Sequence, residues 1–274
     1  MSRAGLLGFF ILAGLAVMAA CTPAHPGTAV SQGDSGNGSH AAVIQRLSAI
    51  TASLPSGVRD RILARPEPFL VLLREVLAES PILVTLVDKE HALPADYAPA
   101  DLIRLRDYRV TINRNDLELR KEVMGDLMRM VRAARTAHVE LALSSTYRSY
   151  AYQKKVFAMN VAQLGLKEAE RESAVPGTSQ HQLGTTIDFG SITPAFADTA
   201  AGRWLESHAW EYGFTMSYPN GYENLTGYIY EPWHFRYIGI PAAQMERDYF
   251  DGIQQRLLVF LHDHRPALSA LAGR

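Results

Sequence analysis

Cysteine is almost absent from this chain, because Cys21 is the only one among 274 residues. A single thiol excludes an intramolecular disulfide framework and any zinc module built from several cysteines. An excess of positive charge is also missing, since 27 basic residues face 28 acidic ones and the formal net charge is −1. This balance would not neutralise a phosphate backbone, so nucleic acid is not expected as a partner.

Several catalytic motifs are missing as well. The sequence contains no Ser-x-x-Lys, no Gly-x-Ser-x-Gly and no His-Glu-x-x-His. The serine penicillin-binding class is therefore unsupported, as are the chemistries tied to the other two motifs. What is present is ordinary globular composition, 47% hydrophobic and 20% charged, which excludes collagen-like, coiled-coil and wholly disordered chains.

Long hydrophobic runs are confined to the N-terminus. Arg3 precedes an almost uncharged apolar run over 6–20, which is shorter than the roughly 20 residues of a spanning helix and typical of a secretory signal. Met18-Ala19-Ala20 before Cys21 resembles a bacterial lipoprotein lipobox, with Met18 where Leu is usual. We predict cleavage before Cys21 and lipidation of its thiol. The alternative is an ordinary signal peptide with an incidental cysteine.

Four segments follow from this pattern. Residues 1–20 are the predicted signal peptide, and 21–40, with many Pro, Gly and Ser residues, are a predicted flexible tether. Apolar residues at helical spacing predict a helical extension over 41–80. Residues 81–264 form the domain that carries the chemistry. The expected location is an exported, membrane-anchored lipoprotein facing the periplasm or cell envelope.

The fold class predicted for this domain is α+β: a small, mainly antiparallel sheet flanked by helices, preceded by the N-terminal helical extension. Alternation and short apolar runs predict strands at 82–87, 139–143, 185–189, 214–218, 228–231 and 233–237. Helical spacing predicts helices at 119–134, 150–164, 204–209 and 241–261. Gly165 is expected to end the second of these helices.

Two histidines have neighbours that suggest a metal site. His181 is followed by Gly184, which permits a tight bend, and by Asp188 on a predicted strand, while His234 follows Glu231 by three residues. Two imidazoles and one carboxylate leave a fourth position open, as in catalytic zinc sites. Glu231 would then be free to move a proton. Spacing alone leaves open the alternative that these are unrelated core or surface residues.

Three motifs in this order resemble a known family. They are Ser144-Ser145-Thr146-Tyr147-Arg148-Ser149 with Gln153, then Ser179-x-His181-x-x-Gly184-x-x-x-Asp188, then Glu231-Pro232-Trp233-His234-x-Arg236-Tyr237. Together they resemble the VanY-type D-alanyl-D-alanine carboxypeptidases, zinc peptidases of the LAS group, over roughly 84–240. One departure is Ser217, which stands before Tyr218-Pro219 where relatives often carry an Arg.

The resemblance implies a role for each matching residue. One Zn²⁺ per chain would be held by His181, Asp188 and His234, with Glu231 as the catalytic base. Arg148 would bind the C-terminal carboxylate of the substrate, as a guanidinium fork can. Gln153 and Ser179 would be hydrogen-bonding residues of the substrate pocket.

The implied activity is removal of the C-terminal D-alanine from peptidoglycan stem peptides. The expected partners are a stem peptide ending in D-Ala and a membrane contacted through the N-terminal lipid anchor. Two alternatives stay open at this point. One is an L,D-carboxypeptidase acting on a shortened stem peptide, and the other is a non-catalytic peptidoglycan-binding or zinc-storing lipoprotein on the same fold, although such a protein has no need of Glu231.

Overall fold

The computed structural model describes residues 35–273, and their side chains from residue 41 onward. The predicted signal peptide, Cys21 and residues 21–34 of the predicted tether lie outside this part of the chain. Within it the helices are α1 (Ser35–Ile50), α2 (Ser56–Ala64), α3 (Pro66–Ala78), α4 (Met124–Thr136), α5 (Tyr150–Leu164), α6 (Leu166–Glu172), α7 (Ala200–His208), α8 (Glu223–Thr226), α9 (Ile240–Tyr249), α10 (Gln254–Asp263) and α11 (Arg265–Leu271). The strands are β1 (Leu102–Arg104), β2 (Thr111–Ile112), β3 (Glu118–Arg120), β4 (Ala142–Ser145), β5 (Thr186–Phe189), β6 (Phe214–Met216) and β7 (His234–Tyr237).

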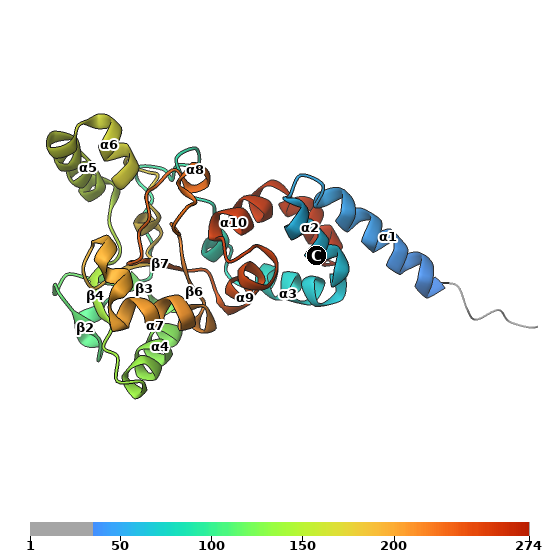
Figure 1. Cartoon of the computed structure of the whole chain (residues 1–274), viewed down its shortest axis with the longest axis horizontal. Helices are drawn as coiled ribbons and strands as arrows, with labels where there is room; N and C mark the ends of the chain where they lie inside the picture. The colour runs from blue at the N-terminus through green and yellow to red at the C-terminus, as the bar shows by residue number, and fades with distance from the viewer. Residues whose placement is uncertain (1–34, 274) are drawn as a thin grey trace, which may run out of the picture.

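The central sheet has five strands in the order β2-β4-β5-β7-β6. Only the β2–β4 pair is parallel, and the other three pairs are antiparallel. β1 and β3 form a separate antiparallel pair. Helices α4 and α7 cover one face of the central sheet (Figure 1). The prediction of an α+β fold with a small, mainly antiparallel sheet is confirmed.

Side chains of the two central strands, β5 and β7, alternate between the apolar core and the opposite face of the sheet. Ile187 and Phe189 of β5, and Phe235 of β7, belong to the apolar core beneath α4 and α7. Successive side chains of a strand point to opposite faces. Asp188 and His234 therefore lie on the other face of the sheet, where the candidate site is built.

A second apolar core joins the two ends of the described chain. Leu47 of α1 and Phe69 of α3 pack in one cluster with Met245 of α9, Leu257 of α10 and Leu268 of α11. Figure 1 shows these helices to the right of the sheet, with α9 beside β6. The helical extension predicted for 41–80 is thus helical and shares its core with the C-terminal helices; a domain boundary at residue 80 stays a prediction. None of the helices over 35–273 is long and apolar enough to span a bilayer.

The strand predicted at 82–87 is wrong, because Pro81–Val84 form a 3-10 turn, η1. The carbonyl oxygens of Leu83 and Thr85 accept hydrogen bonds of 3.0 and 2.7 Å from Nη2 of Arg236. Arg236 is fully buried, and a buried guanidinium must find acceptors. Its side chain bonds to these carbonyls from β7, and residues 82–87 pair with no strand.

The strand predicted at 228–231 is wrong as well. The backbone N–H of Ile229 donates to the carbonyl of Arg171 at 3.2 Å, and the N–H of Glu231 donates to the carbonyl of Tyr218 at 3.0 Å. The backbone N–H groups of this segment thus donate to two different neighbours, and its residues take part in no ladder.

Several helix boundaries differ from the prediction, and the helix predicted at 204–209 begins at Ala200. α1 begins at Ser35, inside the predicted tether, because a helix once nucleated adds residues at little cost. The helix predicted at 119–134 begins at Met124, since Leu119 belongs to β3. The last predicted helix is divided between α9 and α10, because Asp251 and Gly252 have φ values of 60° and 67° that a right-handed helix cannot include.

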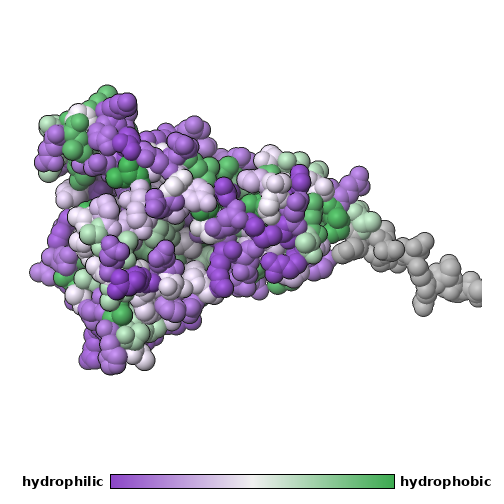
Figure 2. Space-filling view, viewed as in Figure 1, coloured by the Kyte–Doolittle hydropathy of each residue, from purple (hydrophilic) through white to green (hydrophobic). Residues whose placement is uncertain are grey.

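Helix α5 ends where predicted, with Gly165 at φ 79°. The apolar side chains of α5 are not fully buried, however: Val156 and Phe157 are half-buried and Leu164 is 43% exposed. The reason is that α5 packs chiefly against α6, and the two helices form a hairpin that stands out at the upper left of Figure 1. Figure 2 shows apolar surface on this hairpin, where Met159 is exposed.

Candidate active site

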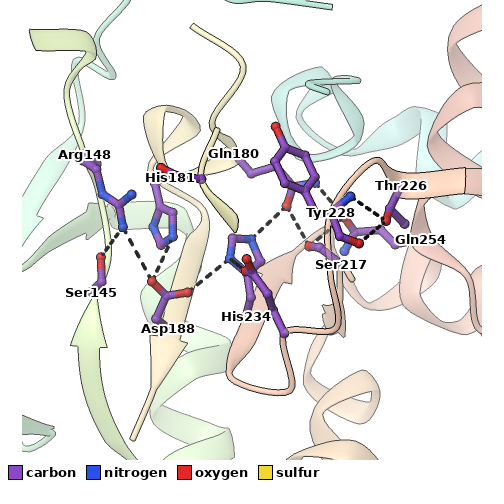
Figure 3. Close-up of polar contacts among 12 residues, drawn as sticks. Ser145, Arg148, Gln180, His181, Asp188, Ser217, Thr226, Tyr228, His234 and Gln254 are labelled. Carbon is purple, nitrogen blue, oxygen red and sulfur yellow. Dashed lines mark hydrogen bonds and ion pairs between the residues drawn. The ribbon is translucent and has the colours of Figure 1, made fainter. Parts of the chain in front are cut away.

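The three predicted metal ligands meet at one point above the sheet. Asp188 of β5 and His234 of β7 are directly paired residues of the antiparallel ladder. His181 lies in the 3-10 turn η4 (Gln180–Leu183), which precedes β5. Oδ2 of Asp188 is 3.1 Å from Nε2 of His181, and Oδ1 is 3.1 Å from Nδ1 of His234 (Figure 3). The structure thus brings the three residues together in a buried cluster, although His181 and His234 are 53 positions apart in the sequence.

Local backbone geometry aims His181 at this point. Gly184 ends η4 in the left-handed conformation, with φ 73°, so the chain turns directly into β5. A Cβ on Gly184 would lie 3.1 Å from Cγ of Pro99, so packing also favours glycine. Nδ1 of His181 is 2.7 Å from the carbonyl oxygen of Thr146. Because a carbonyl only accepts, Nδ1 carries the proton and Nε2 offers its lone pair toward Asp188.

The donor set fits a zinc ion. Tetrahedral zinc with bonds of about 2.0–2.2 Å holds its ligand atoms roughly 3.3 Å apart, close to the 3.1 Å from Oδ2 of Asp188 to His181 and the 3.1 Å from Oδ1 to His234. One donor atom from each of His181, Asp188 and His234 lies within 4.8 Å of the others. Oδ1 of Asp188 is buried, and apart from its ion-pair contact with His234 it has no hydrogen-bond partner among the described residues. A metal ion would satisfy that atom.

The electrostatics of the cluster favour a bound cation. Burial lowers the pKa of His181 to about 4, against the attraction of Asp188. Burial acts in the same sense on His234, but the carboxylates of Asp188 and Glu231 outweigh it and raise its pKa to about 9. Burial raises the pKa of Asp188, yet the two imidazoles hold it well below its usual range. The carboxylates therefore stabilise positive charge at the point where the three ligands converge.

Glu231 lies beside the metal set without belonging to it. The N–H of His234 donates to the carbonyl of Glu231 at 3.1 Å, which closes a turn around Pro232. This turn places Oε2 of Glu231 3.3 Å from Nδ1 of His234, although residues three apart in a regular strand would face opposite sides. Burial raises the pKa of Glu231, while His234 acts to lower it. A carboxyl with a raised pKa, at the wall of a cavity, suits a group that must accept and return a proton.

Arg148 approaches the same point from the end of β4. Its Nη2 lies 3.7 Å from Oδ2 of Asp188 and donates to Oγ of Ser145 at 3.0 Å. Its Nη1 donates to Oε1 of Gln153 at 2.8 Å. Figure 3 shows the guanidinium group directed at the metal set. A planar cation held in this way can bind a carboxylate next to the metal.

The two predicted pocket residues have different positions. Ser179 lines the cavity. Gln153 is fully buried behind Arg148, and its Nε2 donates to the carbonyl of Ala174 at 2.6 Å. The visible contact of Gln153 is thus with Arg148, which it orients, and a direct contact with substrate stays a prediction.

These side chains open onto a cavity of about 510 Å³. Its walls come from the sheet, from the loop before β7 and from the α5–α6 hairpin, which contributes Val156, Asn160 and Glu172. Another cavity, of about 580 Å³, lies beside β6 and α9 and contains none of the predicted site residues. The proposed chemistry therefore belongs to the cavity lined by His181, Asp188 and His234.

Sequence reasoning missed two aromatic walls of this cavity. The rings of Tyr218 and His234 lie 4.7 Å apart, and Tyr218 and Tyr228 are also separated by 4.7 Å. Burial raises the pKa of the Tyr218 phenol well above its usual value, so the hydroxyl keeps its proton. The Tyr-Pro pair after Ser217 was the available signal for Tyr218. Tyr228 follows no motif, and only the fold brings it to the site.

The fold and the His/Asp/His set define a metallopeptidase-type site on an α+β sheet. The profile of the family described as VanY: D-alanyl-D-alanine carboxypeptidase matches residues 116–240. The chain is also 32% identical over 168 residues to the bifunctional D-Ala-D-Ala dipeptidase and D-Ala-D-Ala carboxypeptidase VanXYC of Enterococcus gallinarum, covering 58% of this chain and 85% of that protein. The chain belongs to the VanY D-alanyl-D-alanine carboxypeptidase family.

Other relatives extend the comparison. YodJ of Bacillus subtilis is 38% identical over 174 residues, which cover 61% of this chain and 63% of that relative's length. The solved structure of the LdcB LD-carboxypeptidase has a TM-score of 0.59 at 36% identity and covers 64% of this chain and 85% of its own. A zinc complex of a mutant vancomycin resistance D,D-pentapeptidase VanY has a TM-score of 0.55 at 28% identity, over 65% of this chain and 99% of that one.

Proposed function

We propose that this chain is a zinc-dependent carboxypeptidase that removes the C-terminal D-alanine from peptidoglycan stem peptides. The observation that carries the proposal is the position of Arg148, whose Nη2 is 3.7 Å from the carboxylate of the metal set. A substrate carboxylate held by this guanidinium would lie beside the metal, so only the last peptide bond could reach it. That geometry is the requirement of an exopeptidase.

Each group then has a chemical task. Zinc held by His181, Asp188 and His234 would supply a Lewis acid that polarises the scissile carbonyl and lowers the pKa of water. The Glu231 carboxylate takes a proton from the attacking water and returns it to the nitrogen of the departing D-alanine. Arg148 fixes the terminal carboxylate and thereby the register of the peptide. The aromatic walls exclude bulk water from the reacting bond.

The proposal is tested with defined muropeptides. Incubation of a pentapeptide ending in D-Ala-D-Ala should yield the tetrapeptide and free D-alanine in mass spectrometry, and a chelator should stop the reaction. Intact pentapeptide in the presence of zinc would contradict the assignment. Binding of the muropeptide without cleavage would favour the non-catalytic alternative. The presence of Glu231 argues against that alternative, since a binding protein has no need of that carboxylate.

A second activity is favoured by the similarity to the LdcB LD-carboxypeptidase. An L,D-carboxypeptidase would cleave the tetrapeptide and leave the pentapeptide unchanged. Both substrates present a terminal D-alanine carboxylate to Arg148, so the two activities differ in the residue that precedes the cleaved bond. Parallel incubations with pentapeptide and tetrapeptide muropeptides distinguish them.

We also propose that the protein is exported and held at a membrane by lipidated Cys21. The proposal is supported by the apolar run over 6–20 and by the small residues that precede the cysteine. Lipidation should place the protein in the detergent phase after extraction, and Cys21→Ser should move it to the aqueous phase or leave it unprocessed. A correctly processed Cys21→Ser protein that still partitions into detergent would contradict the anchor.

A further inference from the structure

The imidazole of His234 has a partner on the side away from Asp188. Its Nε2 lies 3.3 Å from Oε1 of Gln180, as the dashed line in Figure 3 shows. Gln180 is the residue immediately before His181 in η4, and its side chain is buried. Two consecutive residues of one turn therefore belong to the site. His181 is itself a predicted metal ligand, and Gln180 contacts the imidazole of His234 on the side away from the metal.

A buried network fixes the direction of the Gln180 amide. The hydroxyl of Ser217 donates to Oε1 of Gln180 at 2.7 Å, and Nε2 of Gln180 donates to Oε1 of Gln254 at 3.4 Å. Nε2 of Gln254 donates in turn to the carbonyl oxygen of Thr215 at 3.3 Å, which can only accept, and to Oγ1 of Thr215 at 2.7 Å. Each amide thus has its nitrogen and its oxygen assigned by its neighbours. The oxygen of Gln180, which can only accept, faces His234.

This orientation selects one tautomer of His234. Because an amide oxygen accepts, Nε2 must carry the proton, and in the neutral imidazole the lone pair of Nδ1 is left to face Asp188 at 3.1 Å. His181 receives the equivalent constraint from a backbone carbonyl, that of Thr146, at 2.7 Å. The constraint on His234 comes instead from a side chain, so it can be removed by substitution.

We propose that Gln180, held by Ser217 and Gln254, is a positioning residue that fixes the tautomer and ring orientation of His234 for metal binding. The inference rests on the proposed zinc site and is independent of which peptide is cleaved. It also gives Ser217 a role. In place of a basic side chain, this chain has a small hydroxyl that fits between two amides and holds one of them against a metal ligand.

The test compares Gln180→Met with Gln180→Glu. The Met variant keeps the side-chain length and removes the acceptor, and loss of such an outer partner typically weakens metal binding by about 10- to 100-fold. We expect a decrease of that size in zinc affinity, measured by competition with a chromophoric chelator. At saturating zinc, kcat should fall while KM stays unchanged. Gln180→Glu restores an oxygen acceptor and should return zinc affinity to within a few-fold of the wild type.

Gln182 offers a matched control. It lies in the same turn and is fully buried, but its Nε2 donates to the carbonyls of Pro94 and Tyr97 at 3.0 and 3.1 Å rather than contacting a ligand. Gln182→Met should lower the thermal stability of the metal-free protein as much as Gln180→Met does, yet leave zinc affinity unchanged. Equal losses of zinc affinity in the two variants would reduce Gln180 to a structural residue and overturn the inference.

A direct readout needs no metal-loaded enzyme. ¹⁵N NMR of the imidazoles in the metal-free protein at high pH should show His234 protonated at Nε2, and Gln180→Met should give a mixture of tautomers. If Gln180→Met does not fold, Ser217→Ala tests the same network, with a smaller loss of zinc affinity expected. Unchanged tautomer and zinc affinity in a folded variant would overturn the inference. Failure of the wild type to bind zinc would instead overturn the proposed function.

Discussion

Asp188 and His234 are opposed residues of neighbouring strands, so the ladder that joins β5 and β7 also fixes two of the three metal ligands. Opposed residues on one face have Cβ atoms about 4.5–5.5 Å apart, and here the side chains close to 3.1 Å between Oδ1 and Nδ1. His181 lies outside the ladder, in a turn, and its imidazole is held by a hydrogen bond to the carbonyl of Thr146. Its loss should therefore leave the sheet intact.

His181→Ala is accordingly expected to remove zinc without unfolding the protein. The wild type should hold about one zinc per chain and the variant almost none, because two ligands seldom suffice for this ion. Elemental analysis gives the metal content, and circular dichroism checks the fold. A folded variant that still holds one zinc per chain would show that the metal binds at another site.

Glu231→Ala separates binding from chemistry. The metal set is complete without Glu231, so zinc content and affinity for a D-Ala-terminated peptide should be retained. Turnover should fall by roughly 10²- to 10⁴-fold, the usual effect of losing a general acid–base group. Steady-state kinetics and metal analysis on the same preparation provide the measurement. Loss of zinc would make Glu231 a ligand, and near-normal turnover would assign the proton transfer to another group.

Arg148→Ala tests recognition of the terminal carboxylate. Removing a charge-assisted contact should cost about 1.5–3 kcal/mol in kcat/KM. The wild type should discriminate in the same way against a peptide with an amidated C-terminus, whereas the variant should no longer distinguish the two. If the wild type cleaved free-acid and amidated peptides equally well, the carboxylate would not be the recognised group.

Glu246 should make stability depend on pH. This residue of α9 is buried, one of its oxygens has no partner among the described residues, and burial raises its pKa to about 8 against a hydrogen bond from Thr215. Between about pH 4.3, its unfolded pKa, and pH 8, the native state keeps a proton that the unfolded state has released. The free energy of unfolding therefore falls as pH rises through this window, by about 1.4 kcal/mol per pH unit at most, and levels off above it.

Glu246→Gln should remove this dependence, because the amide imitates the protonated carboxyl. Urea denaturation at pH 5 and pH 8.5 is the measurement. The stability of the variant should exceed that of the wild type by much more at the higher pH than at the lower one. The same decrease between the two pH values in both proteins would show that Glu246 is ionised in the native state or is not the group responsible.

Motifs whose residues lie close together in the chain could be interpreted from the amino-acid sequence alone. His181, Gly184 and Asp188 are within one turn and one strand, so their juxtaposition follows from local geometry. The turn at Pro232 could likewise be expected, because Glu231 and His234 can share a site only if the strand is interrupted.

Other features depended on contacts that no local pattern encodes. The run 82–87 has the composition of a strand, yet buried Arg236 takes its carbonyls. Gln254 reaches Ser217 and Gln180 only because α10 folds back behind β6. The position of Gln153 could not be inferred either, since a glutamine near an arginine can contact the substrate or hold the arginine, and only packing distinguishes the two.

The shared core of α3 with α9 has a consequence for how this protein is made and shortened. During synthesis, the apolar face of α3 cannot be buried until almost the whole remaining chain, including Met245 of α9, has been made. The family match ends at residue 240, where α9 begins. A fragment cut there would keep every catalytic side chain but leave Phe69 and Leu73 without cover, and it should aggregate. The N-terminal helices α1–α3 and the C-terminal helices α9–α11 must therefore be retained or removed together.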